Sequence, residues 1–254
     1  MKISCVVPVY NNQKTIKRVL TVLNRSSHID ELIVVDDASK DNSREIIERF
    51  IRGKNKVVFL TNEVNQGKGA TVVRGMKRTT HDHVFLCDAD LSKLREEHID
   101  QIIGTYKTQK YDMVIAARET PFEEARGFSK FLATVSGERV FKKAAVETFY
   151  DLISGLGNGI EQITNFAHRD KEVKIITTKN IGHVLKFERG RPTEWVREYV
   201  REGYQLAKTD VKLKRNLAGT VAVSALAGAL FSFWFFSTRN NKRNNNKWRL
   251  PFRD

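Results

Sequence analysis

The feature that most constrains the fold is a regular alternation of short apolar runs with amphipathic runs in the first half of the chain. The apolar runs are rich in β-branched residues and predict strands, while the amphipathic runs have the spacing of helices. The expected strands are 3–9, 31–35, 56–60, 83–87 and 112–117, and the expected helices are 15–23, 43–51, 69–78 and 96–106. Strands that are apolar on both faces and alternate with helices form a mostly parallel sheet flanked by helices, so the predicted fold class is α/β.

The second half of the chain is less regular. Its patterns predict a helix over 128–146, a glycine-rich loop over 154–159, a helix over 160–167 and a strand over 173–177. Residues 193–207 share one apolar face and precede several basic residues, which predicts an amphipathic helix on a membrane surface. A helix packed against the globular domain is the alternative interpretation.

Residues 217–237 contain no charged side chain and lie between Arg215 and Arg239. An apolar helix of about 20 residues crosses a bilayer, and the aromatic residues at one end of this segment resemble an interfacial belt. We therefore predict one transmembrane helix, with a buried core helix as the alternative. Because basic residues flank both ends, the sequence does not fix the orientation of this helix.

These segments predict the domain organisation of the chain. A globular domain spans 1–190, an amphipathic juxtamembrane helix 191–216, the transmembrane helix 217–237, and a basic tail that we expect to be disordered 238–254. The apolar run at the N-terminus is too short for a signal peptide and is interrupted by Pro8. This agrees with a globular domain that faces the cytoplasm.

The formal net charge of +14 indicates an anionic partner, such as nucleic acid, anionic lipid or a phosphorylated substrate. The sequence has no zinc-finger, RNP or basic-zipper pattern, so we expect no nucleic-acid partner. Both cysteines, Cys5 and Cys87, lie in expected buried strands. Their placement indicates small core residues in a reducing compartment rather than a disulfide or metal ligands.

Polar residues follow the expected strands at the end where they leave the sheet. They are Tyr10-Asn11-Asn12, Asp36-Asp37-Ala38-Ser39, the residues 62–69, Asp88-Ala89-Asp90 and Arg118. In a mostly parallel sheet, ligands bind beyond the carboxyl ends of the strands. Since these ends meet at one edge of the sheet, the sequence predicts a binding site at that edge.

The carboxylates of Asp88 and Asp90 are the candidate metal ligands. Two carboxylates two residues apart at a strand end can bind one Mg²⁺ or Mn²⁺, which would bridge the phosphates of a nucleoside diphosphate. Aspartates in this position also begin ordinary turns. Asp36 and Asp37 can accept hydrogen bonds from a ribose hydroxyl or a base N–H. The alternative role at that strand end is capping of the next helix, for which Asp41 is also placed.

The loop over 65–69 leads into an expected helix. Its glycines let backbone amides approach an anion at a helix N-terminus. The loop is not a Walker A loop, because Asn62 and Gly69 stand where that motif needs a glycine and a Ser or Thr. No G-x-G-x-x-G pattern follows the first strand, which disfavours a dinucleotide-binding fold.

Four motifs occur in order, each at a strand end. They are Val7-Pro8-Val9-Tyr10-Asn11, the residues 31–39, Asn65-Gln66-Gly67-Lys68-Gly69 and Asp88-Ala89-Asp90-Leu91. Together they resemble the signature of family 2 glycosyltransferases of the GT-A fold, in particular the branch of dolichyl-phosphate mannose synthases and polyprenyl-phosphate glycosyltransferases. The resemblance covers about residues 1–190 and is looser after 120.

The resemblance implies roles for individual residues. The nucleotide-sugar site would contain Pro8, Tyr10, Asn11, Asp36, Asp37, Lys68, Asp88 and Arg118. Asp88 and Asp90 would bind the Mg²⁺ or Mn²⁺, and His183 would reach the metal or the diphosphate. Arg139 would bind an acceptor phosphate, and Glu161 would supply the later acidic residue of the family. For His183 a structural hydrogen-bonding role is the alternative, and for Glu161 a solvent-facing helix carboxylate.

The resemblance also implies an inverting single displacement, with a UDP- or GDP-sugar as donor and a lipid-linked acceptor, such as polyprenyl phosphate, at the membrane. A hydroxyl acceptor would need Glu161 as general base, whereas a lipid phosphate is already ionised. The alternatives are transfer to a hydroxyl of a glycan, a glycerolipid or a small phosphorylated acid, and a non-catalytic, membrane-anchored nucleotide-binding protein. The sequence leaves the sugar, the acceptor and the oligomeric state, a homo-oligomer included, open.

Overall fold

The computed structural model describes residues 1–118, 136–155 and 159–182, all within the first of the chain's two units, Met1–Arg191. The predicted juxtamembrane helix, transmembrane helix and basic tail lie outside these ranges. No helix within them combines the length and the apolar composition that a bilayer-spanning segment needs.

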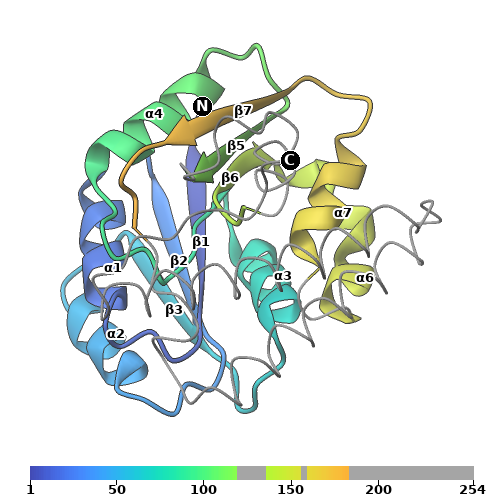
Figure 1. The fold of residues 1–254 in the computed structure, drawn as a ribbon. Helices are drawn as coiled ribbons and strands as arrows, with labels where there is room; N and C mark the ends of the chain where they lie inside the picture. Colours follow the sequence, from blue (N-terminus) through green and yellow to red (C-terminus); the bar gives the residue numbers. More distant parts are fainter. Residues whose placement is uncertain (119–135, 156–158, 183–254) are drawn as a thin grey trace, which may run out of the picture. The chain divides into compact units, whose positions relative to one another are not determined.

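The strands of the described residues form one seven-stranded sheet in the order β3-β2-β1-β4-β6-β5-β7 (Figure 1). They are β1 (Ile3–Val9), β2 (Glu31–Asp36), β3 (Val57–Thr61), β4 (His83–Leu86), β5 (Met113–Arg118), β6 (Arg139–Lys142) and β7 (Val173–Thr178). Neighbouring strands are parallel except at β6, which runs antiparallel to β4 and to β5. The prediction of a mostly parallel α/β sheet is confirmed.

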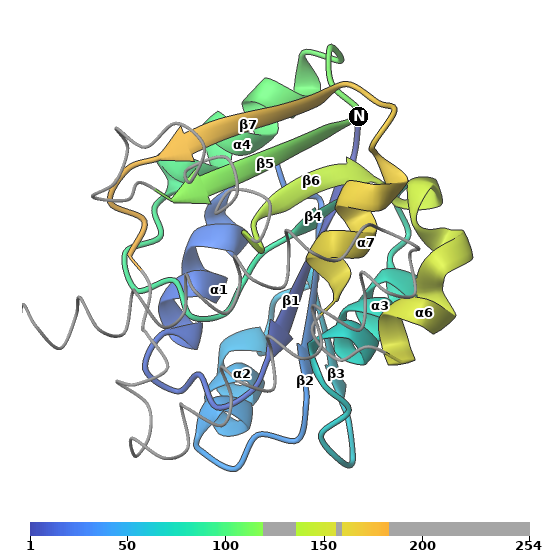
Figure 2. The same cartoon turned by 45° about the vertical axis from the view of Figure 1, so that its right-hand side comes forward.

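Helices cover both faces of this sheet (Figure 1, Figure 2). One face carries α1 (Ile16–Arg25), α2 (Ser43–Ile51) and α4 (Glu96–Lys107), and the other carries α3 (Lys68–Arg78), α6 (Tyr150–Gly155) and α7 (Ile160–Ala167). The 3₁₀ turns η1 (Lys143–Ala145) and η2 (Glu147–Phe149) lead from β6 to α6. Up to the end of β5, every predicted strand and helix is confirmed to within two residues at each end.

The alternation of side chains along β1 divides the core between the two helical layers. Every second residue from Ile3 to Val9 belongs to the core cluster that contains the buried residues of α1 and α4. The intervening Val6 faces α3, so closely that a Cβ on Gly75 would lie 2.5 Å from Val6 Cγ1. The absence of a side chain at Gly75 thus lets α3 pack close to the sheet and brings its first residue, Lys68, to the strand ends.

The cysteines are buried free thiols, as the sequence predicts. Cys5 lies in β1, Cys87 directly follows β4, and both belong to the core cluster. Burial raises the pKa of each thiol well above its ordinary value, so both are inert core residues at neutral pH.

The predicted helix over 128–146 is wrong where the structure describes it. Residues Arg139–Lys142 form β6, which lies between β4 and β5, and the chain then continues through η1. A short apolar run fits a buried strand as well as a helix, and pairing with two neighbouring strands decides for the strand. The predicted loop over 154–159 is also shorter than expected, because Ser154 and Gly155 belong to α6.

Two buried histidines are held by hydrogen bonds in their neutral form, His98 between the start of α4 and the segment after β7, and His168 at the end of its own helix, α7. His98 Nδ1 accepts a hydrogen bond from the Arg95 amide at 3.2 Å, and its Nε2 donates to the Lys179 carbonyl at 3.0 Å. His168 Nδ1 donates to the Thr164 carbonyl of α7 at 2.7 Å. Burial lowers the pKa of both imidazoles below their ordinary value.

We expect the free energy of unfolding to decrease as the pH falls below 6.5, the ordinary histidine pKa. Below this pH the unfolded chain binds protons that the buried imidazoles of the folded state do not yet accept. The contribution of these histidines to stability is therefore fully present above pH 6.5, and it is lost as the pH falls toward their lowered folded-state pKa values. Each pKa unit of difference corresponds to about 1.4 kcal/mol. Urea unfolding at pH 7.5, 6 and 5 measures the effect.

His98→Asn is the variant for this test, because the Asn oxygen can replace Nδ1 as acceptor for the Arg95 amide. We expect this variant to lose less stability than the parent between pH 7.5 and pH 5. An equal loss in parent and variant would show that His98 does not carry the pH dependence.

Candidate active site

The polar residues that follow the strands meet at one edge of the sheet, as predicted. The register aligns Val9 of β1 with Asp36 of β2, and Asp36 with Thr61 of β3. The last residue of β4, Leu86, pairs with Val6, three residues before the end of β1, and the next amide, of Cys87, still bonds to the Val6 carbonyl at 3.1 Å. The loops after β1, β2, β3 and β4 therefore leave the sheet side by side, and the N-terminus of α3 lies at the same edge (Figure 2).

The centre of the site is a cation between two carboxylates. Lys68 Nζ lies 2.9 Å from Asp88 Oδ1 and 2.7 Å from Glu161 Oε1. The exposed fractions of the three side chains are 27% for Lys68, 18% for Asp88 and 10% for Glu161. Burial by itself would lower the pKa of Lys68, but the two carboxylates outweigh it and raise that pKa above its ordinary value, so the ammonium stays charged.

The carboxylate of Asp88 is seated on Gly137, in the segment that leads into β6. A Cβ on Gly137 would lie 2.6 Å from Asp88 Cγ, closer than real side chains approach. The site therefore needs a glycine here to leave space for the Asp88 carboxylate, whereas the backbone conformation at this position does not call for one. The sequence pattern does not reveal this role of Gly137, which lies two residues before Arg139.

The turn between Asp88 and Asp90 is fixed from two sides. Thr15 at the start of α1 donates its hydroxyl to the Ala89 carbonyl at 2.7 Å. After β7, the Ile181 carbonyl accepts the Lys93 amide at 3.0 Å. The chain thus comes close to this turn just before His183, whose predicted contact with the metal lies outside the described residues.

The donor set fits a divalent cation that completes its shell with substrate and water. The described residues contain no group of three or more His, Cys, Asp and Glu side chains that could hold a metal. Asp88 and Asp90 offer oxygen ligands from the end of β4, and Mg²⁺ or Mn²⁺ is commonly bound by one or two carboxylates together with phosphate oxygens and water. The pair is therefore suited to a metal that arrives with a diphosphate.

Asp37 binds the loop before α3. It is 3% exposed, and its carboxylate accepts hydrogen bonds from Asn62 Nδ2 at 2.7 Å, from the Gln66 amide at 2.8 Å and from the Gly67 amide at 2.9 Å. The sequence predicted that the amides of this loop approach an anion. In the structure, that anion is the Asp37 side chain.

The remaining predicted nucleotide contacts differ in exposure. Tyr10 is 38% exposed, while Asn11 accepts the Lys40 amide on its side-chain oxygen at 2.8 Å and is half-buried. Pro8 is a half-buried residue of β1. Asp36 is 1% exposed, and its Oδ1 has no hydrogen-bond partner among the described residues. Tyr10 thus offers an open aromatic face at the site.

Arg118 and Arg139 stand apart from the other predicted residues. Arg118 ends β5, and its side chain lies outside the description. Arg139 is completely buried and donates to the Glu161 carbonyl at 3.0 Å, to Thr164 Oγ1 at 2.5 Å and to Asn165 Oδ1 at 3.0 Å. The predicted contact of Arg139 with an acceptor phosphate does not fit this placement, because its guanidinium is enclosed and fixes α7 against β6.

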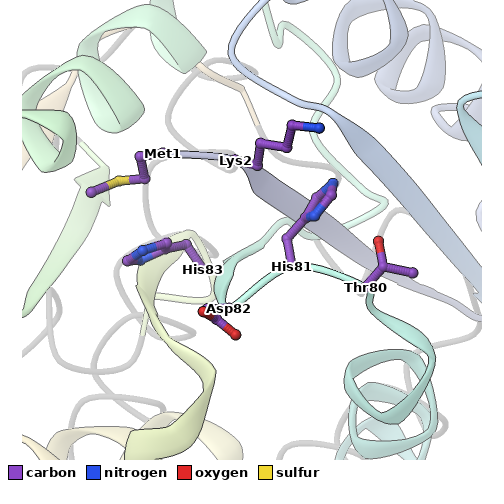
Figure 3. Close-up of a pocket in the computed structure, with 6 residues that line it drawn as sticks. All are labelled: Met1, Lys2, Thr80, His81, Asp82 and His83. Carbon is purple, nitrogen blue, oxygen red and sulfur yellow. The ribbon is translucent and has the colours of Figure 1, made fainter.

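A polar hollow of about 300 Å³ lies at the opposite edge of the sheet (Figure 3). It is lined by Met1, Lys2, Thr80, His81, Asp82 and His83. These residues precede β1 and β4 or begin them, whereas the cluster around Lys68 lies beyond the carboxyl ends of the same strands. The hollow is therefore separate from the candidate active site.

The chain matches a family model and curated relatives. Residues 4–153 match the model described as glycosyl transferase family 2. The chain is 28% identical over 225 residues to the uncharacterized glycosyltransferase YkcC of Bacillus subtilis. This alignment covers 84% of this chain and 64% of that protein. It is 31% identical over 118 residues to the undecaprenyl-phosphate 4-deoxy-4-formamido-L-arabinose transferase of Photorhabdus laumondii. This second alignment covers 44% of this chain and 36% of that protein. The chain thus spans less than two thirds of the length of these relatives.

The fold is also similar to a solved structure. The glucosyl-3-phosphoglycerate synthase from Mycobacterium tuberculosis, in complex with Mn²⁺, uridine-diphosphate (UDP) and glucosyl-3-phosphoglycerate, aligns with a TM-score of 0.60 at 19% identity. The alignment covers 86% of this chain and 82% of that structure. This likeness shows a shared GT-A-like fold.

We expect Gly137→Ala to weaken the binding of UDP in the presence of Mn²⁺ by at least about tenfold, or about 1.4 kcal/mol. The new Cβ displaces the Asp88 carboxylate from its place beside Lys68 and changes its position relative to Asp90. Isothermal titration calorimetry on the purified chain measures the affinity.

Gly104→Ala is the matched control, since a Cβ on this α4 glycine meets no atom within 4 Å. We expect this variant to bind UDP and Mn²⁺ as the parent does. Equal affinities of the two variants would show that the seat of Asp88 on Gly137 does not matter for the site.

Proposed function

The chain belongs to glycosyl transferase family 2, and from this premise we propose that it moves a sugar from a UDP- or GDP-sugar to a lipid acceptor in a membrane, polyprenyl phosphate above all. The observation that carries the proposal is the Lys68 ammonium held between Asp88 and Glu161 at the carboxyl edge of the sheet. This arrangement places positive charge and metal-binding oxygens together, where a nucleoside diphosphate needs both.

Each group of the site has a part in the transfer. A Mg²⁺ or Mn²⁺ ion held by Asp88 and Asp90 would supply positive charge to the leaving diphosphate. Lys68 adds a second positive charge beside Asp88, and the exposed ring of Tyr10 offers a face on which the base can stack. The acceptor oxygen bonds to the anomeric carbon as the bond to the diphosphate breaks. The nucleoside diphosphate leaves with the electron pair, and the configuration inverts.

The state of Glu161 favours an acceptor that is already ionised. Its Oε1 already accepts a hydrogen bond from the Lys68 ammonium at 2.7 Å, so this oxygen is engaged by a cation and not by an acceptor hydroxyl. A phosphate oxygen needs no proton removed, whereas a hydroxyl does. The similarity to the undecaprenyl-phosphate 4-deoxy-4-formamido-L-arabinose transferase of Photorhabdus laumondii supports the same acceptor class.

The other residues of the site and the membrane segment complete the proposal. Pro8, Asn11, Asp36 and Arg118 would line the nucleotide-sugar site, and His183 would reach the metal or the diphosphate. The predicted transmembrane helix over 217–237 would hold the active site at a membrane, with the catalytic domain on the cytoplasmic side, where nucleotide sugars are made. Among the alternatives, transfer to a hydroxyl of a small phosphorylated acid has support from the fold of the Mycobacterium structure.

We expect membranes from cells that express the chain to transfer label from UDP-glucose, UDP-N-acetylglucosamine or GDP-mannose, with Mn²⁺, into the organic-solvent extract. Mild acid should release the label, because a sugar linked to a lipid phosphate is acid-labile. The Asp90→Asn variant should give none, since it loses a metal-binding carboxylate.

Three outcomes separate the proposal from its alternatives. Acid-labile lipid label that depends on Asp90 supports the proposal and names the donor. Donor turnover that depends on Asp90 without lipid label keeps the glycosyltransferase and excludes the lipid acceptor. Folded protein in the membrane without turnover of these donors contradicts the proposed donors.

We expect Glu161→Gln to lower the rate of lipid labelling by less than about tenfold, because an ionised acceptor needs no general base. Loss of a general base that the reaction does use would cost about 10²–10⁴-fold. The Gln oxygen can still accept the hydrogen bond from Lys68, so the site keeps its shape. Initial rates at saturating donor measure the effect. A loss of several hundredfold would show that Glu161 removes a proton and that the acceptor is a hydroxyl.

A further inference from the structure

The loop that precedes Lys68 is held by an internal anion. Both oxygens of the Asp37 carboxylate are engaged, Oδ1 by Asn62 Nδ2 and the Gln66 amide, and Oδ2 by the Gly67 amide. Asn65 Nδ2 adds a longer bond of 3.4 Å to the Asp37 carbonyl. Successive amides of the loop are therefore turned toward the protein and away from a ligand.

Asn62 holds the Asp37 carboxylate in place. It is 3% exposed, and its Nδ2 donates to Asp37 Oδ1 at 2.7 Å and to Thr71 Oγ1 at 3.2 Å. Its Oδ1 accepts Arg74 Nη1 at 2.5 Å, and its amide bonds to the Asp36 carbonyl at 2.8 Å. Asn62 thus connects the end of β3, the Asp37 carboxylate and the first turns of α3.

The same contacts fix the backbone from which Lys68 extends. Gly67 has a φ of +87°, a conformation that favours glycine, and directly precedes Lys68, the first residue of α3. The Gly67 carbonyl accepts both the Thr71 amide at 3.1 Å and the Thr71 hydroxyl at 2.9 Å. With the Gly67 amide bound to Asp37, the peptide groups on either side of Gly67 are held.

We propose that Asp37 and Asn62 are positioning residues, which hold the loop over 65–67 so that Lys68 is presented between Asp88 and Glu161. The proposal rests on the proposed function only in taking Lys68 as part of the donor site. It differs from the role that the family resemblance implies for Asp37, a direct contact with the nucleoside. The carboxylate is 3% exposed and already accepts three hydrogen bonds, which leaves about one of its four acceptor sites, on Oδ2, for a base N–H.

A double-mutant cycle on nucleotide affinity tests the proposal. The dissociation constants of UDP and of GDP, each with Mn²⁺, are measured by calorimetry for the full chain and for Asn62→Ala, Lys68→Ala and the double variant. If Asn62 acts through Lys68, each single variant weakens binding about tenfold, or about 1.4 kcal/mol. The double variant is then no more than about twofold weaker than Lys68→Ala, because the coupled effects do not add.

Two further variants keep the test decisive. Thr71→Val removes the hydroxyl between Asn62 and Gly67 at nearly constant volume, and it replaces Asn62→Ala if that variant does not fold. Ser4→Ala is the control for a general loss of stability. Its hydroxyl is fully buried and donates to Glu31 Oε2 at 2.6 Å, at the opposite edge of the sheet. We expect Ser4→Ala to lower the melting temperature and to leave nucleotide affinity unchanged.

Additive losses in the Asn62 and Lys68 variants would overturn the proposal. So would an Asp37→Asn loss that stays undiminished in the Lys68→Ala background, because Asp37 would then contact the nucleotide directly. Nucleotide affinity of Asn62→Ala equal to that of Ser4→Ala would also overturn it. Failure of the unmodified chain to bind either nucleotide would overturn the proposed function, and the inference with it.

Discussion

The active site depends on one electrostatic interaction, the pairing of the Lys68 ammonium with the carboxylates of Asp88 and Glu161. The carboxylates of Asp88, which is half-buried, and of Glu161, which is buried, would repel each other without a cation between them. Lys68 and Glu161 are 93 positions apart in the sequence, so their bond also connects the N-terminus of α3 to α7. Removal of the ammonium would leave two partly buried negative charges without compensation, which is more costly than the loss of an exposed ion pair.

The surrounding structure provides for this pairing on every side. Gly75 lets α3 approach the sheet, and Gly137 leaves space for the Asp88 carboxylate. Arg139, buried under α7, donates to the Glu161 carbonyl and so fixes the backbone from which the Glu161 carboxylate extends. Asp37 fixes the loop before Lys68. Arg139 and Asp37 are buried charged side chains with hydrogen-bond partners, the condition under which burial of such groups is tolerated.

The sequence predicts much of this arrangement because strand ends follow from chain patterns alone. Lys68, Asp88 and Asp37 were expected at one edge, and they are found there. The neighbouring Asp36 and Asp37 differ in their contacts, since Asp36 accepts the Ser39 amide whereas Asp37 accepts the amides of the loop before α3. The strand β6 and the burial of Arg139 at its start could not be predicted. A strand of four residues carries no local signal for the two strands that pair with it. The partners of the Arg139 guanidinium, more than 20 positions away on α7, are likewise invisible in the sequence.

The charges of the site argue for a divalent cation beside the ammonium. Asp88, Asp90 and Glu161 carry three negative charges against the one positive charge of Lys68, which leaves two. The neighbouring Glu138 and Arg139 are also buried and add one formal charge of each sign, so they leave this balance unchanged. A diphosphate would bring further negative charge to a site that Lys68 alone does not neutralise. The ammonium makes the two carboxylates compatible with each other, and the divalent ion that we propose on Asp88 and Asp90 would make the site compatible with the diphosphate.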